Sequence, residues 1–194
     1  MSQATHHRGP DDEGVFLANR WSLGHNRLSI IDLSAAGHQP MVSRDKKFVI
    51  TYNGELYNYL EMKKELEEKG YAFKSKTDTE VILYAYQEWG TACLQKFNGM
   101  FAFAILNTET EELFLARDHI GIKPLYYYHK GNRFIFSSEV KAILQHDVDT
   151  PLNYDALNMY FRLLYVPSPA TMWKNIFKLP PAHYALVSKE GSVK

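Results

Sequence analysis

The chain has 194 residues, of which 45% are hydrophobic and 14% aromatic. This composition argues against disorder and is enough to bury the core of one domain, with two small domains as the alternative. Its 22 basic and 22 acidic residues cancel, so the net charge excludes a general attraction to nucleic acid or to an anionic membrane. No apolar run approaches the roughly 18 residues that a membrane-spanning helix needs, and no signal peptide is evident. The single cysteine excludes an internal disulfide, which is typical of a reducing compartment. We therefore predict a soluble cytoplasmic protein.

The first part of the chain predicts three strands and a loop. Residues 14 to 30 predict two strands around a turn at Asn19 and Arg20. Residues 46 to 53 predict a third strand that ends at an Asn53-Gly54 turn. Residues 32 to 43 contain a glycine and a proline and predict a loop before this strand.

Two helices are predicted next. Residues 57 to 70 carry leucines and opposite charges at helical spacing and end at a glycine, which predicts a solvated surface helix. Residues 77 to 90 begin with Thr77 or Asp78 as the N-cap and end at Gly90. Their more apolar composition predicts a more buried helix.

Four strands are then predicted, at residues 100 to 107, 112 to 118, 124 to 130 and 133 to 139. The first two form one hairpin and the last two another, and their near-continuous hydrophobicity indicates that both faces are covered. Antiparallel hairpins with segregated helices favour an α+β layered fold over a doubly wound parallel sheet.

The chain changes character after a short helix predicted near residues 139 to 146. Residues 151 to 194 predict a helix, a connector punctuated by prolines and a final strand. We expect their aromatic side chains to be exposed and to form a surface for another domain.

Four groups of polar residues at the ends of predicted elements are candidates for a site: Arg8 to Asp11, Arg27, Asn53 to Glu55, and Asp78. A backbone N–H at a glycine and a neighbouring side-chain amide are the two kinds of donor that an oxyanion hole uses. An arginine can bind a carboxylate with its planar fork, and an acid can pair with an ammonium. Together these groups predict a pocket for an α-amino acid with acyl chemistry at its side-chain end.

Each candidate also has a purely structural interpretation. Asn-Gly after a strand is a common turn, Asp78 suits a helix cap, and Arg27 alone suits a surface charge. The eight histidines lack metal-ligand spacing, and phosphate-loop, dinucleotide and G-x-S-x-G patterns are missing. Cys93 lies at helical spacing among apolar residues, which predicts inert core packing.

Eight motifs, in order, closely resemble the glutaminase domain of glutamine-dependent asparagine synthetases: "HRGPDDEG", "HNRLSIIDLS", "GHQP", "YNGELYN", "KTDTEVIL", "GMFAFAI", "ARDHIGIKPLYY" and "FSSEVKAI". Those domains are class II glutamine amidotransferases of the N-terminal-nucleophile (Ntn) hydrolase fold. The resemblance covers nearly the whole chain. "RGPDDEG" and the tail "YVPSPATMWKNIFKLPPAHY" are similar to the asparagine synthetase branch and not to the sugar or phosphoribosyl amidotransferases, with β-lactam synthetases as the alternative.

The resemblance implies roles for particular residues. Arg27 would hold the glutamine α-carboxylate, and Glu55 and Asp78 would take the α-ammonium. The Asn53 side chain and the Gly54 N–H would stabilise the oxyanion when the carboxamide is attacked. The wall of the pocket would be formed by the backbone of Leu28, Ser29, Ile30 and Ile31.

The nucleophile of the family is a cysteine that follows the initiator methionine, with its own α-amine as the base. Here "MSQATHHRGP" matches the end of the family's first helix, so the resemblance implies that the leading strand and its cysteine are missing, and Cys93 does not replace them. We therefore expect an Ntn-type fold without its first strand, and no glutaminase activity. We also expect an uncovered sheet edge that favours a homodimer or a swapped contact.

The resemblance further implies that residues 1 to 147 form the amidotransferase domain, and that residues 148 to 194 are its end and a connector toward an absent synthetase domain. Glutamine and that synthetase domain are the expected partners. ATP and magnesium would bind only there, so no cofactor or metal is expected in this chain. The alternative is a non-catalytic module that binds glutamine or another protein.

Overall fold

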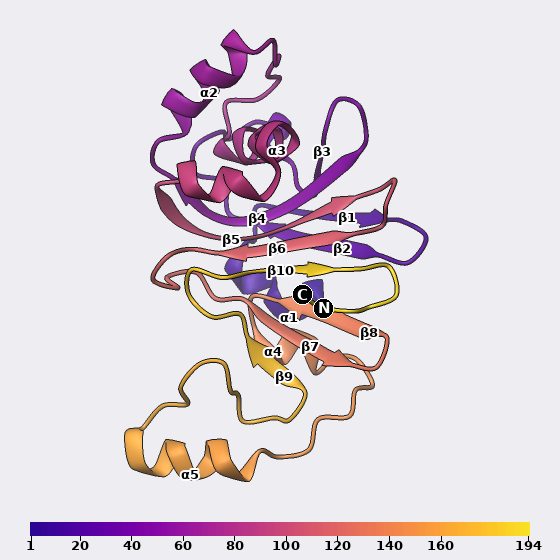
Figure 1. The fold of residues 1–194 in the computed structure, drawn as a ribbon, viewed down its shortest axis with the longest axis vertical. Helices are drawn as coiled ribbons and strands as arrows, with labels where there is room; N and C mark the ends of the chain where they lie inside the picture. The colour runs from indigo at the N-terminus through magenta and orange to yellow at the C-terminus, as the bar shows by residue number, and fades with distance from the viewer.

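The computed structural model describes residues 1–194, which form four layers in the order helix, sheet, sheet, helix (Figure 1). Helices α2 (Tyr59–Glu68) and α3 (Asp78–Trp89) cover one face of the first sheet. Short helices α1 (Ser2–Thr5) and α4 (Val140–Ile143) lie against the second layer. The predicted layered α+β architecture is confirmed.

The first sheet has five antiparallel strands in the order β10-β6-β5-β4-β3. Side chains such as Phe101 and Phe103 pack toward the helices, while Ala102 and Ala104 face the second layer. Burial of both faces explains the near-continuous hydrophobicity of these strands. The bounds are β3 (Met41–Val42), β4 (Phe48–Leu56), β5 (Gly99–Asn107), β6 (Leu113–Arg117) and β10 (Tyr184–Val187).

The second layer consists of two separate sheets. Strands β1 (Asp12–Leu17) and β2 (Ser22–Arg27) form a hairpin, and a second sheet has the order β8-β7-β9. Its strands are β7 (Tyr126–Lys130), β8 (Arg133–Ser137) and β9 (Ile176–Lys178). The predicted hairpins are confirmed, and β2 and β8 each end their sheet as an unpaired edge.

The helix predictions are also confirmed. The Thr77 hydroxyl accepts a hydrogen bond from the Glu80 N–H at 3.3 Å, so Thr77 and not Asp78 is the N-cap of α3. Gly70 follows α2 with a φ of 95°, in the left-handed region that a glycine tolerates. The N-terminal half of the chain also contains three short 3₁₀ helices: η1 (His6–Arg8), η2 (Ala35–Gly37) and η3 (Gly90–Lys96).

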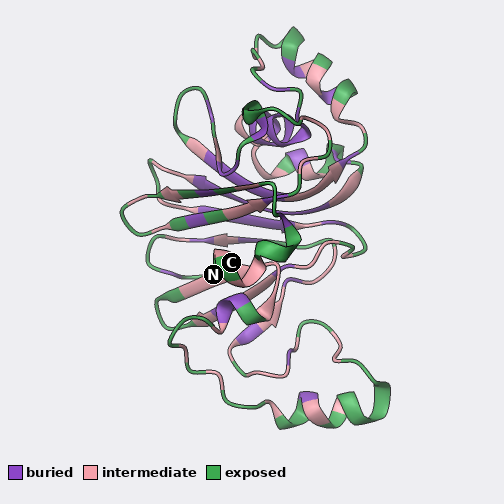
Figure 2. Cartoon of the chain, turned by 180° about the vertical axis from the view of Figure 1, so that it is seen from behind, coloured by how far each residue is buried: buried purple, intermediate pink, exposed green.

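The C-terminal segment contributes one strand to each layer, because β9 pairs with β7 and β10 pairs with β6. Between α4 and β9, helix α5 (Tyr154–Leu163) stands away from the body and is largely exposed (Figure 2). Only Ala156 of this helix is buried. The expected exposed aromatic surface is confirmed and consists of Tyr154, Tyr160, Phe161 and Tyr165.

One prediction about the backbone is wrong. Asn53 and Gly54 do not form a turn but lie inside β4, where they pair with Ala102 and Phe101 of β5. The nine-residue strand β5 carries β4 past the Asn-Gly pair to Leu56, so pairing with a distant segment overrides the local turn preference.

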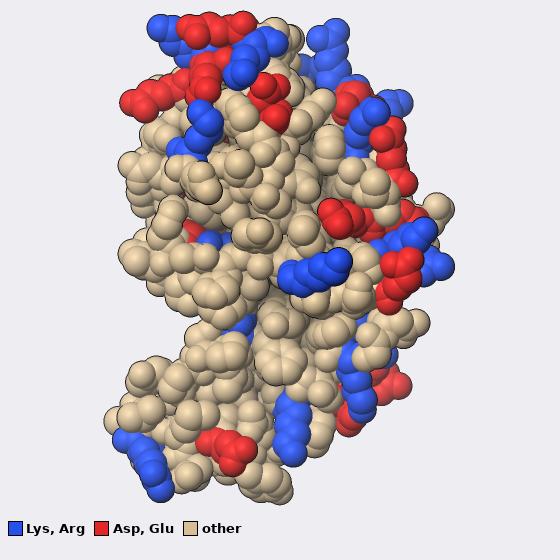
Figure 3. Space-filling model, viewed as in Figure 1, with Lys and Arg blue, Asp and Glu red and all other residues tan.

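The charged side chains are mixed. On the face shown in Figure 3, Lys and Arg side chains alternate with Asp and Glu, and no large area carries one sign. No helix of the chain is both long and apolar enough to span a bilayer.

Candidate functional site

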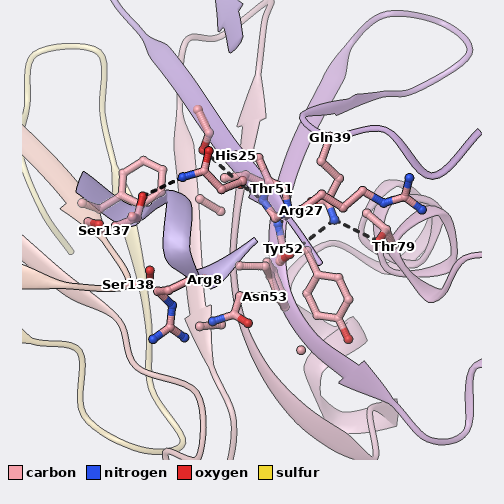
Figure 4. A pocket seen from close by; sticks show the side chains of 18 of the residues that line it. Arg8, His25, Arg27, Gln39, Thr51, Tyr52, Asn53, Thr79, Ser137 and Ser138 are labelled. Carbon is pink, nitrogen blue, oxygen red and sulfur yellow. Dashed lines mark hydrogen bonds between the residues drawn. The ribbon is translucent and has the colours of Figure 1, made fainter. Parts of the chain in front are cut away.

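A cavity of about 680 Å³ opens at the gap in the second layer. Its floor includes Thr51 and Asn53 of β4 and Ala102 of β5, and its sides come from β2 and β8. Figure 4 shows Thr51 and Asn53 between Ser137 and Ser138 on one side and Gln39 and Thr79 on the other. The cavity brings together most of the residues singled out from the sequence: Arg8, Arg27, Leu28, Ile30, Ile31, Asn53, Gly54, Glu55 and Asp78.

Gly54 has an unpaired backbone N–H at the open edge of β4. Just beyond the ends of β4 and β5, the Tyr57 N–H donates to the Asn98 carbonyl at 2.8 Å. Because backbone groups alternate in direction along a strand, the N–H and C=O groups of odd-numbered residues of β4 face β5, and those of even-numbered residues face away from it. The Tyr52 N–H binds the Gln39 side chain at 2.7 Å, and the Leu56 N–H binds Asp78 at 2.9 Å. The Gly54 N–H between them makes no hydrogen bond, and it is therefore free for a ligand.

Asn53 supplies a second donor next to the first. Even-numbered side chains of β4, such as Tyr52 and Leu56, pack toward the helices, so Asn53 and Glu55 point to the opposite face, where the cavity lies. The Asn53 side chain makes no hydrogen bond to the protein. A side-chain amide and a backbone N–H from consecutive residues thus line one cavity, as an oxyanion hole requires.

Asp78 is a buried carboxylate at the start of α3. Its Oδ2 accepts hydrogen bonds from the Tyr52 hydroxyl at 2.8 Å and from the Leu56 N–H at 2.9 Å. Burial raises the pKa of the Asp78 carboxyl, although these two hydrogen bonds oppose the rise. A cationic ligand group beside Asp78 would favour its charged form, so the site is suited to an ammonium.

Arg27 is buried at the end of β2 and is held by the following loop. Its Nη1 donates to the Ser34 carbonyl at 3.0 Å, and its Nη2 donates to the Asp32 carbonyl. Gly37 packs so closely that a Cβ there would lie 2.0 Å from Nη2. The loop therefore fixes the guanidinium in place, and its remaining N–H donors are available to a carboxylate.

His25 lies on the same face of β2 as Arg27 and beside the floor of the cavity. Its Nδ1 is 3.0 Å from the Thr51 hydroxyl oxygen. Burial, reinforced by the nearby Arg27, lowers the pKa of His25 to about 4. The imidazole is therefore neutral at pH 7 and adds no positive charge to the cavity.

The other predicted residues have different positions. Ser29 does not line the cavity, because its N–H donates to the Asp11 carboxylate at 2.8 Å in a separate depression. Arg8 lines the cavity and also pairs with Glu139 at 3.2 Å, just after β8. Gly9 and Pro10 lie outside the cavity lining, so residues 8 to 11 contribute to it only through Arg8.

Cys93 does not belong to this site. It is fully buried in η3 and packs in the hydrophobic core between the helices and the first sheet, on the far side from the cavity. Burial raises the pKa of its thiol to about 12, so the reactive thiolate is negligible at pH 7. The prediction of inert core packing is confirmed.

Gln39, which was not among the predicted site residues, holds the edge of β4 in place from a loop. Its buried side chain accepts from the Tyr52 N–H at 2.7 Å and donates to the Tyr52 carbonyl at 3.3 Å, as a neighbouring strand would. The amide also lies 3.4 Å from the Thr79 hydroxyl. The only signal in the sequence was the motif "GHQP", and it does not reveal which backbone the glutamine meets.

The whole chain, residues 1–194, matches the family model described as glutamine amidotransferase domain. A Methanocaldococcus jannaschii protein, provisionally named glutamine-hydrolyzing asparagine synthetase 2, is 46% identical over 92% of this chain and 38% of its own length. Glutamine-hydrolyzing asparagine synthetase 1 of Bacillus subtilis is 39% identical over 100% of this chain and 30% of its own length. The chain thus spans about a third of these relatives.

The fold is also similar to that of a solved structure. Glutamine phosphoribosylpyrophosphate amidotransferase from B. subtilis superimposes with a TM-score of 0.62 at 22% identity, over 89% of this chain and 34% of that one. The similarity confirms the predicted Ntn-type layered fold.

Proposed function

Because this chain belongs to the glutamine amidotransferase domain family, we propose that its cavity binds free L-glutamine. The observation that carries the proposal is the single unpaired N–H of Gly54 on the open edge of β4, in one cavity with the fixed guanidinium of Arg27 and the buried carboxylate of Asp78. Arg27 binds the α-carboxylate, and Asp78 with Glu55 binds the α-ammonium. The γ-carboxamide oxygen then lies against the Gly54 N–H and the Asn53 amide.

This arrangement stabilises the negative charge that develops on the carboxamide oxygen during attack. The two donors are fixed before the ligand arrives, so they need no reorganisation in the transition state. His25 and Thr51, which are hydrogen-bonded to each other, make the floor of the cavity polar. Because His25 is neutral, neither side chain adds a positive charge that would draw the carboxamide oxygen away from the Gly54 N–H and the Asn53 amide.

Residues 1–194 bind glutamine but do not hydrolyse it on this proposal. The one cysteine, Cys93, is buried away from the cavity with a pKa of about 12, so no thiolate faces the carboxamide. Oxyanion stabilisation without a nucleophile retains only about 10³- to 10⁴-fold acceleration over water in well-studied hydrolases.

The domain acts as the ammonia-supplying part of an asparagine synthetase. Residues 1 to 147 form the amidotransferase body, and residues 148 to 194 close it and lead toward a synthetase domain, which the exposed aromatic surface of α5 contacts. ATP and magnesium bind that further domain, where aspartate is amidated, and the enzyme is cytoplasmic. The similarity of the chain to glutamine-hydrolyzing asparagine synthetases supports this assignment.

Calorimetry with L-glutamine and an ammonia-release assay on the 194-residue chain test the proposal. We expect heat of binding without enzyme-like ammonia release. Arg27→Ala removes charge-assisted hydrogen bonds worth about 1.5–3 kcal/mol, so the affinity should fall about 10- to 100-fold. Arg162→Ala, on the exposed helix α5, is the matched control and should bind as the wild type does.

The folding of each variant is checked by circular dichroism, and Arg27→Lys, which keeps the charge but lacks the fork, should also bind more weakly. Absence of heat with millimolar glutamine, or equal affinity in folded Arg27→Ala, would contradict glutamine binding. Rapid ammonia release would contradict the inactivity.

A further inference from the structure

The two ring nitrogens of His25 have different surroundings. Nδ1 lies 3.0 Å from the hydroxyl oxygen of Thr51 (Figure 4), and this hydroxyl donates its single proton to the Gly24 carbonyl oxygen at 3.5 Å. Because the Thr51 proton is used in this way, the Thr51 oxygen accepts a hydrogen bond from His25, and the proton of the neutral imidazole lies on Nδ1. Nε2 is left with a lone pair and can only accept a hydrogen bond.

The surroundings of the His25 ring keep Nε2 unprotonated at pH 7. Burial lowers the pKa of His25 to about 4, and Arg27, two residues further along β2, contributes to the lowering. Asp12 acts in the opposite direction, but its carboxylate pairs with His38 at 2.7 Å. About one imidazole in a thousand is therefore charged at pH 7.

The Nε2 atom of His25 is open to the cavity. It makes no hydrogen bond within the protein, and it is not enclosed, because Asn26 Oδ1 is the one buried side-chain nitrogen or oxygen that lacks a partner. The His25 side chain is half-buried and lines the cavity of about 680 Å³. An acceptor without a partner is therefore presented to a ligand in this cavity.

The His25 ring lies beyond Asn53 along the floor of the cavity. Its bond to Thr51 places it near the start of this part of β4, whereas Asp78 bonds to the Leu56 N–H at the end of the strand. Asn53 lies between these two points, so the α-ammonium of the proposed ligand lies at one end of the row, the carboxamide in the middle and the imidazole beyond the carboxamide. Alternate residues of a strand lie about 7 Å apart, a span that a carboxamide nitrogen and one hydrogen bond can bridge.

The hydrogen-bond donors of the site do not by themselves favour glutamine over glutamate. The Gly54 N–H and the Asn53 amide would bind the γ-carboxylate of glutamate more tightly than a neutral carboxamide, because hydrogen bonds to a charged acceptor are about twice as strong. A group that accepts a hydrogen bond from the carboxamide nitrogen, and offers nothing to a carboxylate oxygen in the same place, reverses this order.

We propose that His25 is this group, and that its Nε2 lone pair makes the cavity selective for L-glutamine over L-glutamate. The inference rests on the proposed binding of glutamine and assigns a specificity-determining residue to the same site. Nε2 accepts a hydrogen bond from the carboxamide N–H of glutamine. A carboxylate oxygen of glutamate at that position meets a second acceptor, gains no hydrogen bond and is repelled by the lone pair.

Calorimetry of the 194-residue chain with L-glutamine and with L-glutamate at pH 7 tests the selectivity. We expect the wild type to bind glutamine at least about tenfold more tightly than glutamate. His25→Phe keeps a planar ring but has no acceptor, so the ratio of the two affinities should fall by at least about tenfold. His183→Phe is the matched control, because His183 is exposed and does not line the cavity, and its ratio should stay within about twofold of the wild type.

A long-range ¹H–¹⁵N spectrum of the histidine side chains covers the case in which His25→Phe fails to fold. In the wild type we expect His25 to carry its proton on Nδ1, and we expect the Nε2 resonance to shift with saturating glutamine but not with glutamate. A proton on Nε2, equal wild-type affinity for the two ligands, or an unchanged affinity ratio in folded His25→Phe would overturn the selectivity and leave glutamine binding intact. Absence of heat with millimolar glutamine would contradict glutamine binding itself, and the selectivity with it.

Discussion

Replacing Gly54 by alanine is expected to destabilise the fold by about 3 kcal/mol or more and to abolish glutamine binding by whatever chain still folds. The new Cβ would lie 2.2 Å from the Met100 carbonyl oxygen and 2.8 Å from the Phe101 Cα, both of which belong to the backbone of the central strand β5. A shift that relieves this overlap also moves the unpaired Gly54 N–H out of line. Thermal and urea unfolding measure the first effect, and calorimetry measures the second.

Gly131→Ala is the control for the loss of a glycine. Gly131 has a φ of 60°, and a Cβ added there would have no atom within 4 Å, so its replacement carries only the left-handed backbone cost of about 1–2 kcal/mol. If Gly54→Ala is no less stable than Gly131→Ala, the close approach of β4 to β5 at Gly54 does not exist as described.

Replacing Gln39 by alanine should have the second largest effect, a loss of about 2–4 kcal/mol in unfolding free energy. The substitution leaves the N–H and carbonyl of Tyr52 without partners in a buried position, since strand β3 reaches only as far as Ile50. Tyr52 precedes Asn53 and also bonds to Asp78, so glutamine affinity should fall as well. Urea unfolding and calorimetry measure the two effects.

Gln145→Ala is the matched control, because Gln145 makes a side-chain to backbone hydrogen bond to the Lys141 carbonyl at 3.2 Å on the surface. Its loss should change the stability by no more than about 0.5 kcal/mol. Similar small losses of unfolding free energy in both variants would show that the two hydrogen bonds between the Gln39 side chain and the Tyr52 backbone contribute little to stability.

The elements of the fold could be predicted from the sequence because their signals are local. The cap of α3 and the two-residue turns of the β1–β2 and β7–β8 hairpins involve neighbours in the chain. The Asn53-Gly54 pair was misassigned because its conformation depends on β5, more than 40 residues later, and Asn53 pairs there with Ala102.

Only part of the candidate site could be predicted, because only some of its residues can be recognised without knowing their distant neighbours. Arg27, Asn53 and Asp78 carry chemistry that can be recognised from residue type, and the structure brings them to one cavity. The role of Gln39 depends on where a loop places a neutral amide against a strand edge, which no local pattern encodes. The family resemblance placed Ser29 in the wall of the pocket, but its N–H donates to the Asp11 carboxylate instead.

In the proposed complex, the unpaired Gly54 N–H donates a hydrogen bond to the carboxamide oxygen of glutamine. A two-dimensional ¹H–¹⁵N spectrum of the chain, titrated with L-glutamine, tests it most directly. We expect the Gly54 amide resonance to shift downfield as its N–H gains an acceptor, while the amide resonances of the exposed helix α5 stay in place. Saturation with glutamine that leaves the Gly54 resonance in place would contradict it.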